Sequence, residues 1–314
     1  MRALILEGER RVRLVECPSP VPADGEVHVR VRNVGLCGSD LQAMMGSMPG
    51  LPLPLVMGHE FGGLLDDGSH VVVNPMLGCG RCAACEHGNS HRCPDRRVLG
   101  FRVSGAFAEA VVVPRRNVIP SPGLDALRAA LVEPVATGLH AWRRAGCPMG
   151  SVAIIGAGSL GMCLLHVLRA CGVASVSVSD PVAARREYAE KAGAARTMAQ
   201  LQGTFETVFD TAGTEGTRRD AVDCTVMGGT VALLGLHDDQ LHLSAAAMIV
   251  GDRSVVGCFA YNETEFRDAV ALTARMEAPW AHVVEFDDAE TALAAHFAGH
   301  SPPDRIKTIF RVSQ

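Results

Sequence analysis

The stretch VAIIGAGSLG, residues 152–161, decides the fold of this 314-residue chain. Its first four residues predict a short buried strand, and the apolar run 160–171 predicts a helix. The glycines between them have the spacing G-x-G-x-x-G, which permits a tight turn, a close approach of the backbone to a pyrophosphate, and close packing of helix on strand. Free N–H groups at the start of the helix then face the phosphates. We therefore expect a dinucleotide site formed by Gly156, Gly158, Ser159, Leu160 and Gly161.

An acidic residue stands where a turn of this kind needs one. Asp180 ends the next predicted strand, nineteen residues after Gly161. A carboxylate there hydrogen-bonds the ribose 2′-OH of NAD, and it repels the 2′-phosphate of NADP by about 4 kcal/mol at about 4 Å and an effective dielectric of about 20. Arg185 lies close by in the sequence and opposes that repulsion. We expect NAD to be preferred over NADP. The alternatives are that Asp180 only caps a helix, and that the turn binds S-adenosylmethionine.

Strand and helix alternate from about residue 124 onwards, whereas the first hundred residues contain short strands and turns. A helix is expected over 124–144, with an interruption near Pro134. Apolar runs predict later strands at 152–155, 174–179, 207–210, 230–235 and 254–258, and a second helix at 183–192. This alternation predicts the α/β class, with a doubly wound parallel sheet covered by helices on both faces.

The ends of the chain are expected to share one domain. Early strands are predicted at 11–16, 27–34, 71–73 and 110–113. The parallel sheet is complete before the last fifty residues, so the tail is expected to return to the first domain. Its predicted elements are a helix at 263–278, a strand at 282–286, a helix at 289–298 and a strand at 306–312.

Composition excludes several classes of protein. Hydrophobic residues make up 48% and charged residues 20%, as in an ordinary globular chain, and the net charge of −5 argues against a nucleic-acid binder. The apolar stretch 145–168 holds five glycines and a proline, which favours a buried strand–turn–helix over a membrane span. The first residues reach Glu7 and Glu9 without an apolar core, so we expect no signal peptide and a cytoplasmic protein. Only 2 of 29 basic residues are lysines, a bias typical of bacteria with GC-rich genomes.

Four cysteines lie within one short loop, at the spacing C-x2-C-x2-C-x7-C. They are Cys79, Cys82, Cys85 and Cys93. Four thiolates suit a tetrahedral zinc ion with no open position, which is a structural site. An iron–sulfur cluster is the alternative, because Cys93 is followed by Pro94 as in ferredoxins, although the seven-residue spacing departs from their pattern.

A second set of candidate ligands is spread along the chain. Cys37 lies in GLCGSD, His59 and Glu60 in GHEFGG, and Glu133 opens EPVATGLHA. Each is a weak signal alone. In this order, with the cysteine loop and the glycine turn, they resemble the zinc-dependent medium-chain alcohol dehydrogenases, and EPVATGLHA is most similar to the polyol branch, which includes sorbitol and threonine dehydrogenases. The resemblance covers nearly the whole chain.

The resemblance implies two domains and two zinc ions per chain. It implies a GroES-like β-rich catalytic domain at 1–137 and 263–314, with a structural zinc lobe at about 76–95, and a Rossmann NAD-binding domain at 138–262. Cys37 and His59 would bind the catalytic zinc, with either Glu60 or Glu133 as the third ligand. Asp40 would orient His59, and Ser39 would take the proton from the substrate hydroxyl. The family often has histidine where Gln42 stands here, so the end of the proton relay is open.

The implied activity is hydride transfer between a secondary alcohol and NAD, of class EC 1.1.1. The substrate would be a small alcohol (a polyol, sugar alcohol, cyclitol or amino-alcohol), converted to its ketone. Family position suggests Phe101, Arg102, Ser104 and Phe259 for the substrate pocket. A homo-oligomer, dimer or tetramer, is implied. The alternatives are an NAD-binding zinc scaffold without turnover, a threonine or amino-cyclitol dehydrogenase of a biosynthetic pathway, and an iron–sulfur redox protein.

Overall fold

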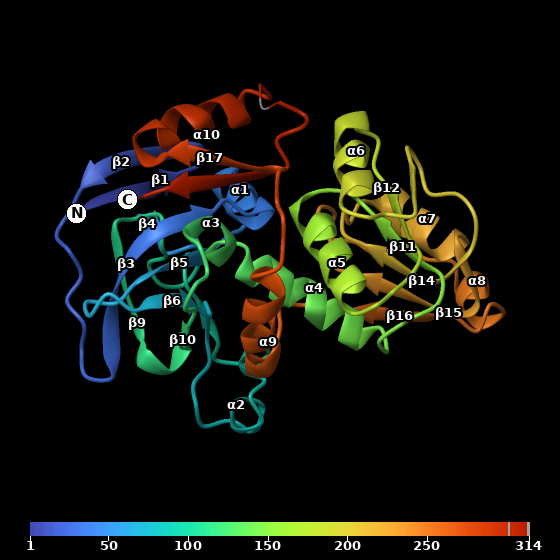
Figure 1. Ribbon diagram of the computed structural model, residues 1–314, viewed down its shortest axis with the longest axis horizontal. Coiled ribbons are helices and arrows are strands. Elements are labelled where there is room, and N and C mark those ends of the chain that lie inside the picture. Colours follow the sequence, from blue (N-terminus) through green and yellow to red (C-terminus); the bar gives the residue numbers. More distant parts are fainter. Residues whose placement is uncertain (301, 313–314) are drawn as a thin grey trace. The chain divides into compact units, whose positions relative to one another are not determined.

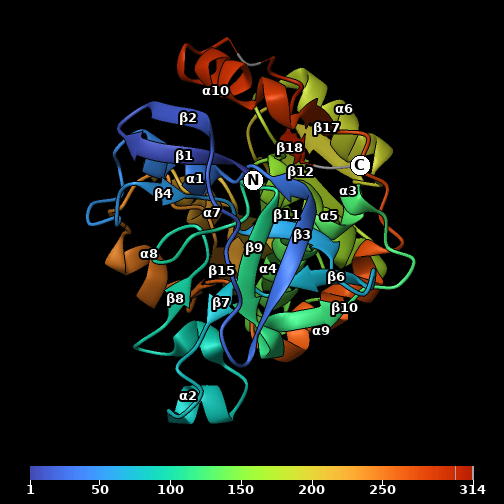
Figure 2. The same cartoon turned by 90° about the vertical axis from the view of Figure 1, so that its left-hand side faces the viewer.

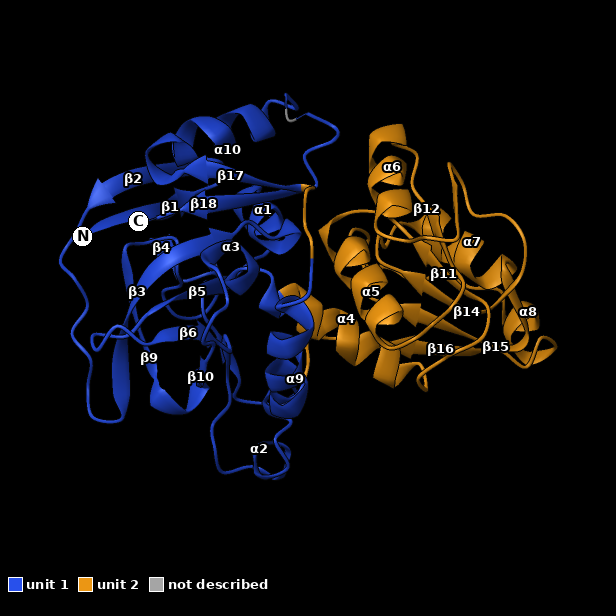
Figure 3. Cartoon of the chain, viewed as in Figure 1, with its two compact units in different colours: residues 1–133, 262–276, 281–314 blue, residues 134–261, 277–280 orange. Residues whose placement is uncertain are grey.

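The computed structural model describes residues 1–300 and 302–312, and the chain forms two compact units. The first unit contains residues 1–133, 262–276 and 281–314, and the second contains 134–261 and 277–280 (Figure 3). Within the described part of the chain, no helix is long and apolar enough to cross a membrane.

The second unit is built on a sheet of six parallel strands, in the order β13-β12-β11-β14-β15-β16 (Figure 1). The strands are β11 (Val152–Ile155), β12 (Val176–Ser179), β13 (Arg196–Met198), β14 (Phe205–Asp210), β15 (Thr225–Leu233) and β16 (Ser254–Gly257). All residues of β11 and β12 are buried, as a parallel sheet covered on both faces requires. The predicted α/β class and doubly wound sheet are confirmed. The short edge strand β13 was not predicted, because the sequence Arg-Thr-Met has no apolar pattern.

Helices connect these strands. They are α4 (Val132–Arg144), α5 (Ser159–Ala170), α6 (Ala183–Lys191), α7 (Glu215–Asp223) and α8 (Ala245–Ile249). Helix α5 packs on β11 and β12, whereas α7 packs on β14 and β15. Since the strand order reverses at β11, right-handed crossovers put the helices of the two halves on opposite faces. In doubly wound sheets a ligand site is expected at the carboxyl ends of the strands where the order reverses, and here the glycine turn follows β11 at that point.

The helical stretch 124–144 is interrupted, but the interruption expected near Pro134 lies before that residue. Helix α4 runs through this residue, and the break lies at Ala130 and Leu131, between α4 and the short helix α3 (Ala126–Ala129). Pro134 is the third residue of α4, where a backbone N–H has no partner within the helix. Its missing N–H therefore costs nothing, and its fixed φ favours the first turn.

The first unit contains a seven-stranded sheet in the order β10-β6-β5-β3-β18-β17, with β9 also paired to β3 (Figure 2). The strands are β3 (Glu26–Gly35), β5 (Glu60–Leu64), β6 (His70–Val73), β9 (Ala110–Pro114), β10 (Val118–Pro120), β17 (Ala281–Glu285) and β18 (Lys307–Arg311). The inward residues of β3, Val27, Val29 and Val31, are buried in the core. The tail returns to this unit as expected, because β18 pairs antiparallel with β3.

Smaller elements complete the first unit. A three-stranded sheet has the order β2-β1-β4, and β7 pairs with β8. These strands are β1 (Arg2–Gly8), β2 (Arg11–Glu16), β4 (Leu55–Val56), β7 (Met76–Leu77) and β8 (Arg97–Val98). The helices are α1 (Gly38–Met44), α2 (Ala83–Glu86), α9 (Glu263–Thr273) and α10 (Ala289–Phe297), with 3-10 turns η1 (Ser90–Arg92), η2 (Arg115–Asn117) and η3 (Phe286–Asp288).

Candidate functional site

Cys37, His59 and Glu60 come together at one end of the seven-stranded sheet. Cys37 caps helix α1 directly after β3, and His59 and Glu60 stand at the start of β5. The antiparallel register pairs Gly35 with Glu60, so the ends of these two strands are neighbours. One donor atom from each of the three residues lies within 4.8 Å of the others. Glu133, which is also described, does not belong to this group.

The backbone before His59 requires a glycine. Gly58 has a φ of +90°, in the left-handed region that side chains disfavour. A Cβ at this position would also lie 2.7 Å from a ring carbon of Phe107. The turn at Gly58 therefore places His59 next to β5, and the Phe107 ring packs against the backbone of Gly58.

The Asp40 carboxylate contacts both Cys37 and His59. Its Oδ2 accepts a hydrogen bond of 3.0 Å from the Cys37 N–H, and its Oδ1 lies 3.4 Å from Nδ1 of His59. The side chains of Asp40 and His59 are buried. Burial lowers the pKa of His59, but the neighbouring Asp40 carboxylate and Cys37 sulfur outweigh it, so this pKa is well above its ordinary value. The surroundings of His59 thus favour a positive charge at the imidazole.

This donor set fits a zinc ion. A thiolate, an imidazole and a carboxylate are all ordinary zinc ligands, and a metal cation supplies the positive charge that the surroundings of His59 favour. With its Nδ1 directed at Asp40, His59 has Nε2 left for a metal. Three protein ligands leave one coordination position, which is the arrangement of catalytic zinc sites.

The four cysteines of the loop, Cys79, Cys82, Cys85 and Cys93, also lie together, with their sulfur atoms within 4.8 Å of one another. The loop follows β7 and includes α2 and η1. A backbone N–H from Arg81 contributes most to lowering the pKa of Cys79 to about 7, whereas burial raises the pKa of Cys85 to about 12. Gly78 leaves room for the cluster, because a Cβ there would lie 2.6 Å from the sulfur of Cys85. Four sulfurs without a further donor suit a closed, structural zinc site.

The glycine turn has the geometry that the sequence predicts. Gly156 has a φ of +98°, and a Cβ on Gly161 would lie 1.9 Å from the Gly156 carbonyl oxygen. At Gly158, by contrast, a Cβ would meet nothing within 4 Å, so the backbone is open on that side. The buried Ser159 Oγ has no hydrogen-bond partner among the described residues. An open backbone and an unpaired hydroxyl at a helix N-terminus fit the pyrophosphate of a dinucleotide.

Asp180 has a role that the sequence did not suggest. Its Oδ2 accepts a hydrogen bond of 2.9 Å from the Ala157 N–H, in the glycine turn, and its Oδ1 accepts one of 2.9 Å from the Val182 N–H. Arg185 Nη1 lies 3.8 Å from Oδ2. The carboxylate is buried and joins the end of β12 to the turn after β11. It therefore stabilises the glycine turn, in addition to the ribose contact that the sequence predicts for it.

One of the four suggested pocket residues contacts the metal ligands. The Phe101 ring packs on His59, with 5.1 Å between ring centroids. Arg102 is exposed and donates to the Gly50 carbonyl, and Ser104 is exposed. Phe259 is 46% exposed and belongs to the second unit.

Sequence reasoning missed Lys307, a buried residue that pairs with Glu60. In the sequence, Lys307 is one of only two lysines and lies within the predicted strand 306–312. Since the partner is 247 residues away, the pattern around either residue does not reveal the pair.

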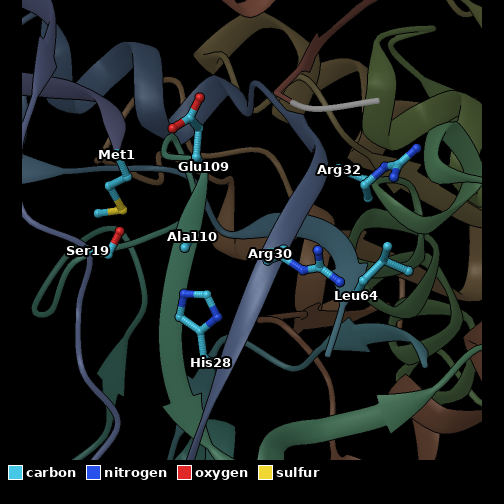
Figure 4. A pocket seen from close by; sticks show the side chains of 8 residues that line it. All are labelled: Met1, Ser19, His28, Arg30, Arg32, Leu64, Glu109 and Ala110. Carbon is cyan, nitrogen blue, oxygen red and sulfur yellow. The ribbon is translucent and has the colours of Figure 1, made fainter. Parts of the chain in front are cut away.

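A separate pocket of about 480 Å³ opens on the outer face of β3 and β9 (Figure 4). Its lining residues are Met1, Ser19, His28, Arg30, Arg32, Leu64, Glu109 and Ala110. None of them is a predicted site residue. His28 pairs with Asp66 at 3.1 Å at the edge of this pocket.

Comparison with known proteins agrees with this geometry. The family model described as alcohol dehydrogenase GroES-like domain matches residues 23–123, and the one described as zinc-binding dehydrogenase matches residues 159–275. The chain is 32% identical to L-galactonate-5-dehydrogenase of Escherichia coli K12 over 268 residues, which is 78% of each protein.

Solved structures show the same likeness over the full length. Galactitol-1-phosphate dehydrogenase from Escherichia coli matches with a TM-score of 0.89 at 28% identity, over 99% of this chain and 100% of that one. A zinc-binding dehydrogenase from Sinorhizobium meliloti 1021, solved with NADP, matches with a TM-score of 0.89 at 26% identity, over 99% and 98%. The resemblance seen in the sequence is confirmed: the chain belongs to the zinc-binding medium-chain dehydrogenases and is a zinc-dependent NAD(P) alcohol dehydrogenase.

Proposed function

We propose that this enzyme interconverts a secondary alcohol and its ketone, with a substrate that carries further polar groups: a polyol, sugar alcohol, cyclitol or amino-alcohol. The observation that carries the proposal is the group of Cys37, His59 and Glu60, which offers three donors and leaves a metal one free position. A scaffold without turnover has no use for such an open site. The relative that acts on L-galactonate supports a hydroxyl-rich substrate.

Cys37, His59 and Glu60 would hold the catalytic zinc. Bound there, zinc supplies a Lewis acid that lowers the pKa of an alcohol hydroxyl. Ser39, on the first turn of α1 beside Cys37, takes the hydroxyl proton. Asp40 holds the ring of His59 in one orientation and so fixes which nitrogen faces the metal. Gln42 does not titrate, so the proton continues to water or to the cofactor ribose.

Glu60 is proposed as the third ligand, in preference to Glu133. Its carboxylate oxygen lies within 4.8 Å of the cysteine and histidine donors, whereas Glu133 is outside that group. Zinc content separates the two: Glu60→Gln is expected to lower zinc to about one ion per chain after dialysis, and Glu133→Gln to retain two. Equal retention by both variants would contradict this assignment.

The cofactor of this chain is proposed to be NAD in preference to NADP. The charge of Asp180 disfavours a 2′-phosphate, and Arg185 beside it weakens the preference without reversing it. Bound NAD supplies the hydride acceptor. The first unit would then be the catalytic domain with both zinc sites, and the second the NAD-binding domain. The units divide at 133/134 and 261/262, whereas the expected division was at 137/138 and 262/263.

The enzyme is proposed to act as a homo-oligomer. In the second unit Met227, Ile249 and Val250 are 70%, 79% and 74% exposed. A backbone hydrogen bond of 2.9 Å from Gly228 to Gly251 holds their two segments side by side. A patch of this kind is covered in a stable protein, often by a second copy. Light scattering is expected to give a dimer or tetramer, and Ile249→Arg to lower the mass; a monomeric parent would contradict this.

Replacing the thiolate tests the activity most simply. We expect the zinc-loaded parent to carry two zinc ions, and Cys37→Ser to carry one, to lose alcohol oxidation, and still to bind NADH by fluorescence. Cys147→Ser is the matched control, because Cys147 is exposed and outside both metal groups. If Cys37→Ser kept full turnover, the proposed role of this site would be wrong.

A further inference from the structure

Lys307 is a buried cation directly behind the catalytic metal ligands. Its side chain is 1% exposed, and it stands at the start of β18. Its Nζ donates to Oε2 of Glu60 and also, at 3.0 Å, to the Leu36 carbonyl. Only one other lysine exists in the chain, Lys191, which lies on helix α6.

These two contacts reach both segments that carry metal ligands. Leu36 immediately precedes Cys37, and Glu60 immediately follows His59. The Leu36 N–H also donates to the Thr308 carbonyl at 2.9 Å, so β18 holds this segment from both sides of the peptide. The start of β18 therefore fixes the spacing between the cysteine and the glutamate.

The ion pair of Lys307 and Glu60 lies directly against the backbone of Gly35. A Cβ on Gly35 would lie 2.3 Å from Oε2 of Glu60 and 2.9 Å from Cε of Lys307. Gly35 has no left-handed φ, so the need for glycine here is steric. Any larger residue would push the carboxylate and the ammonium apart.

The formal charges around the metal site also favour this cation. Asp40, Glu60 and the Cys37 thiolate together carry −3, a zinc ion contributes +2, and Lys307 brings the sum to zero. Asp40 and Glu60 are buried at 0% and 1% exposure, where water does not screen an uncompensated charge. Without Lys307 the metal-bound site would retain one unpaired negative charge.

We propose that Lys307 is a positioning residue of the catalytic metal centre, which occupies one oxygen of Glu60 so that the other oxygen is presented as a single metal ligand. The inference rests on the proposed function, because it takes Cys37, His59 and Glu60 to hold zinc. The affinity of the site for its metal would therefore depend on β18, a strand from the opposite end of the sequence.

Zinc release to a chromogenic chelator tests the proposal on the intact enzyme. We expect Lys307→Met to release one zinc per chain at least about ten times faster than the parent, and Lys307→Arg to restore slow release. The zinc of the four-cysteine site is an internal control, since it should leave at the parent rate. Lys191→Met is the matched control for loss of a lysine and should change neither rate. Gly35→Ala should behave like Lys307→Met, because it displaces the pair without removing charge.

Cobalt(II) in the exchangeable site adds a readout that does not depend on turnover. The visible spectrum is expected to change in Lys307→Met and to return in Lys307→Arg, since it reports the position of the glutamate ligand. Parent-like release and spectrum in Lys307→Met would overturn the inference. If that variant does not fold, Gly35→Ala decides: faster release supports the inference and parent-like release overturns it. A parent that binds only one metal per chain would refute the proposed function instead.

Discussion

Oδ1 of Asp40 lies 3.4 Å from Nδ1 of His59, while Oδ2 of the same carboxylate accepts the Cys37 N–H at 3.0 Å. One buried side chain thus contacts two of the three metal ligands. It fixes the ring of His59 through its charge and the position of Cys37 through its hydrogen bond. The spacing of three residues between Cys37 and Asp40 follows from this contact. Cys37 is the N-cap of α1 and Asp40 is its third residue, so the Asp40 side chain reaches back to the N–H of the cap.

Removing the charge of Asp40 is expected to weaken the metal site. Asp40→Asn keeps the shape but no longer favours the tautomer with a proton on Nδ1, so zinc affinity should fall by about 10–100-fold, with kcat/KM falling alongside. Competition with a chelator measures the affinity. Asp66→Asn is the matched control, because Asp66 pairs with His28 at 3.1 Å on the surface. Equal effects of the two substitutions would contradict the role of Asp40.

Breaking the four-cysteine site is expected to cost stability. Cys82→Ser removes one sulfur from the group, and the loop 78–93 has few apolar contacts of its own to replace the metal. We expect one zinc ion fewer per chain and a Tm lower by at least about 5 °C, measured by metal analysis and calorimetry. If zinc content and Tm were unchanged by this substitution, the four cysteines would not share a metal ion.

Cofactor choice is expected to change when Asp180 loses its charge. Asp180→Asn can still accept the Ala157 N–H, so the glycine turn should persist. Loss of the repulsion should lower KM for NADP by at least about 10-fold, while kcat with NAD changes little. Initial rates with both cofactors measure this. Arg185→Ala is the companion variant and should raise KM for NADP only; an unchanged NADP preference in both variants would mean that another group selects the cofactor.

Low pH is expected to remove the contribution of the Arg2–Glu109 ion pair to the free energy of unfolding. Burial raises the pKa of Glu109, but the backbone N–H and guanidinium of Arg2 lower it by more, so the pKa lies below its ordinary value. Such a carboxyl stabilises the fold above its unfolded pKa of about 4.3 and loses this contribution as the pH falls through the folded pKa. Glu109→Gln should therefore lower the free energy of unfolding at pH 7 by at most about 1 kcal/mol, and the difference should shrink as the pH is lowered toward 3. Urea unfolding at both pH values measures it, and a difference that grows in acid would contradict the argument.

The sequence was most informative where function depends on spacing along the chain. The glycine turn could be located because Gly156 and Gly161 are close in sequence and each has a local steric reason to be glycine. The cysteine loop was predicted for the same reason, since its four ligands come from fifteen consecutive residues. A strand was predicted at 306–312, where β18 lies, and its return to the first unit was predicted from the length that a six-stranded doubly wound sheet needs.

Features that depend on distant partners were not predictable. Nothing near Glu60 in the sequence indicates Lys307, because β-sheet pairing brings them together from opposite ends of the chain. The choice between Glu60 and Glu133 stayed open for the same reason. Pro134 misled because a proline breaks a helix interior but not its first turn. The break lies before the proline, at Ala130 and Leu131, and α4 begins at Val132.

Oxidation of a hydroxyl-rich secondary alcohol with NAD is the activity that we propose for this chain. The direct measurement is NADH formation at 340 nm by the zinc-loaded enzyme across a panel of polyols, sugar alcohols, cyclitols and amino-alcohols. We predict turnover with at least one of them, abolished in Cys37→Ser. Protein that carries two zinc ions and binds NAD, yet turns over no alcohol and reduces no corresponding ketone, would contradict the account.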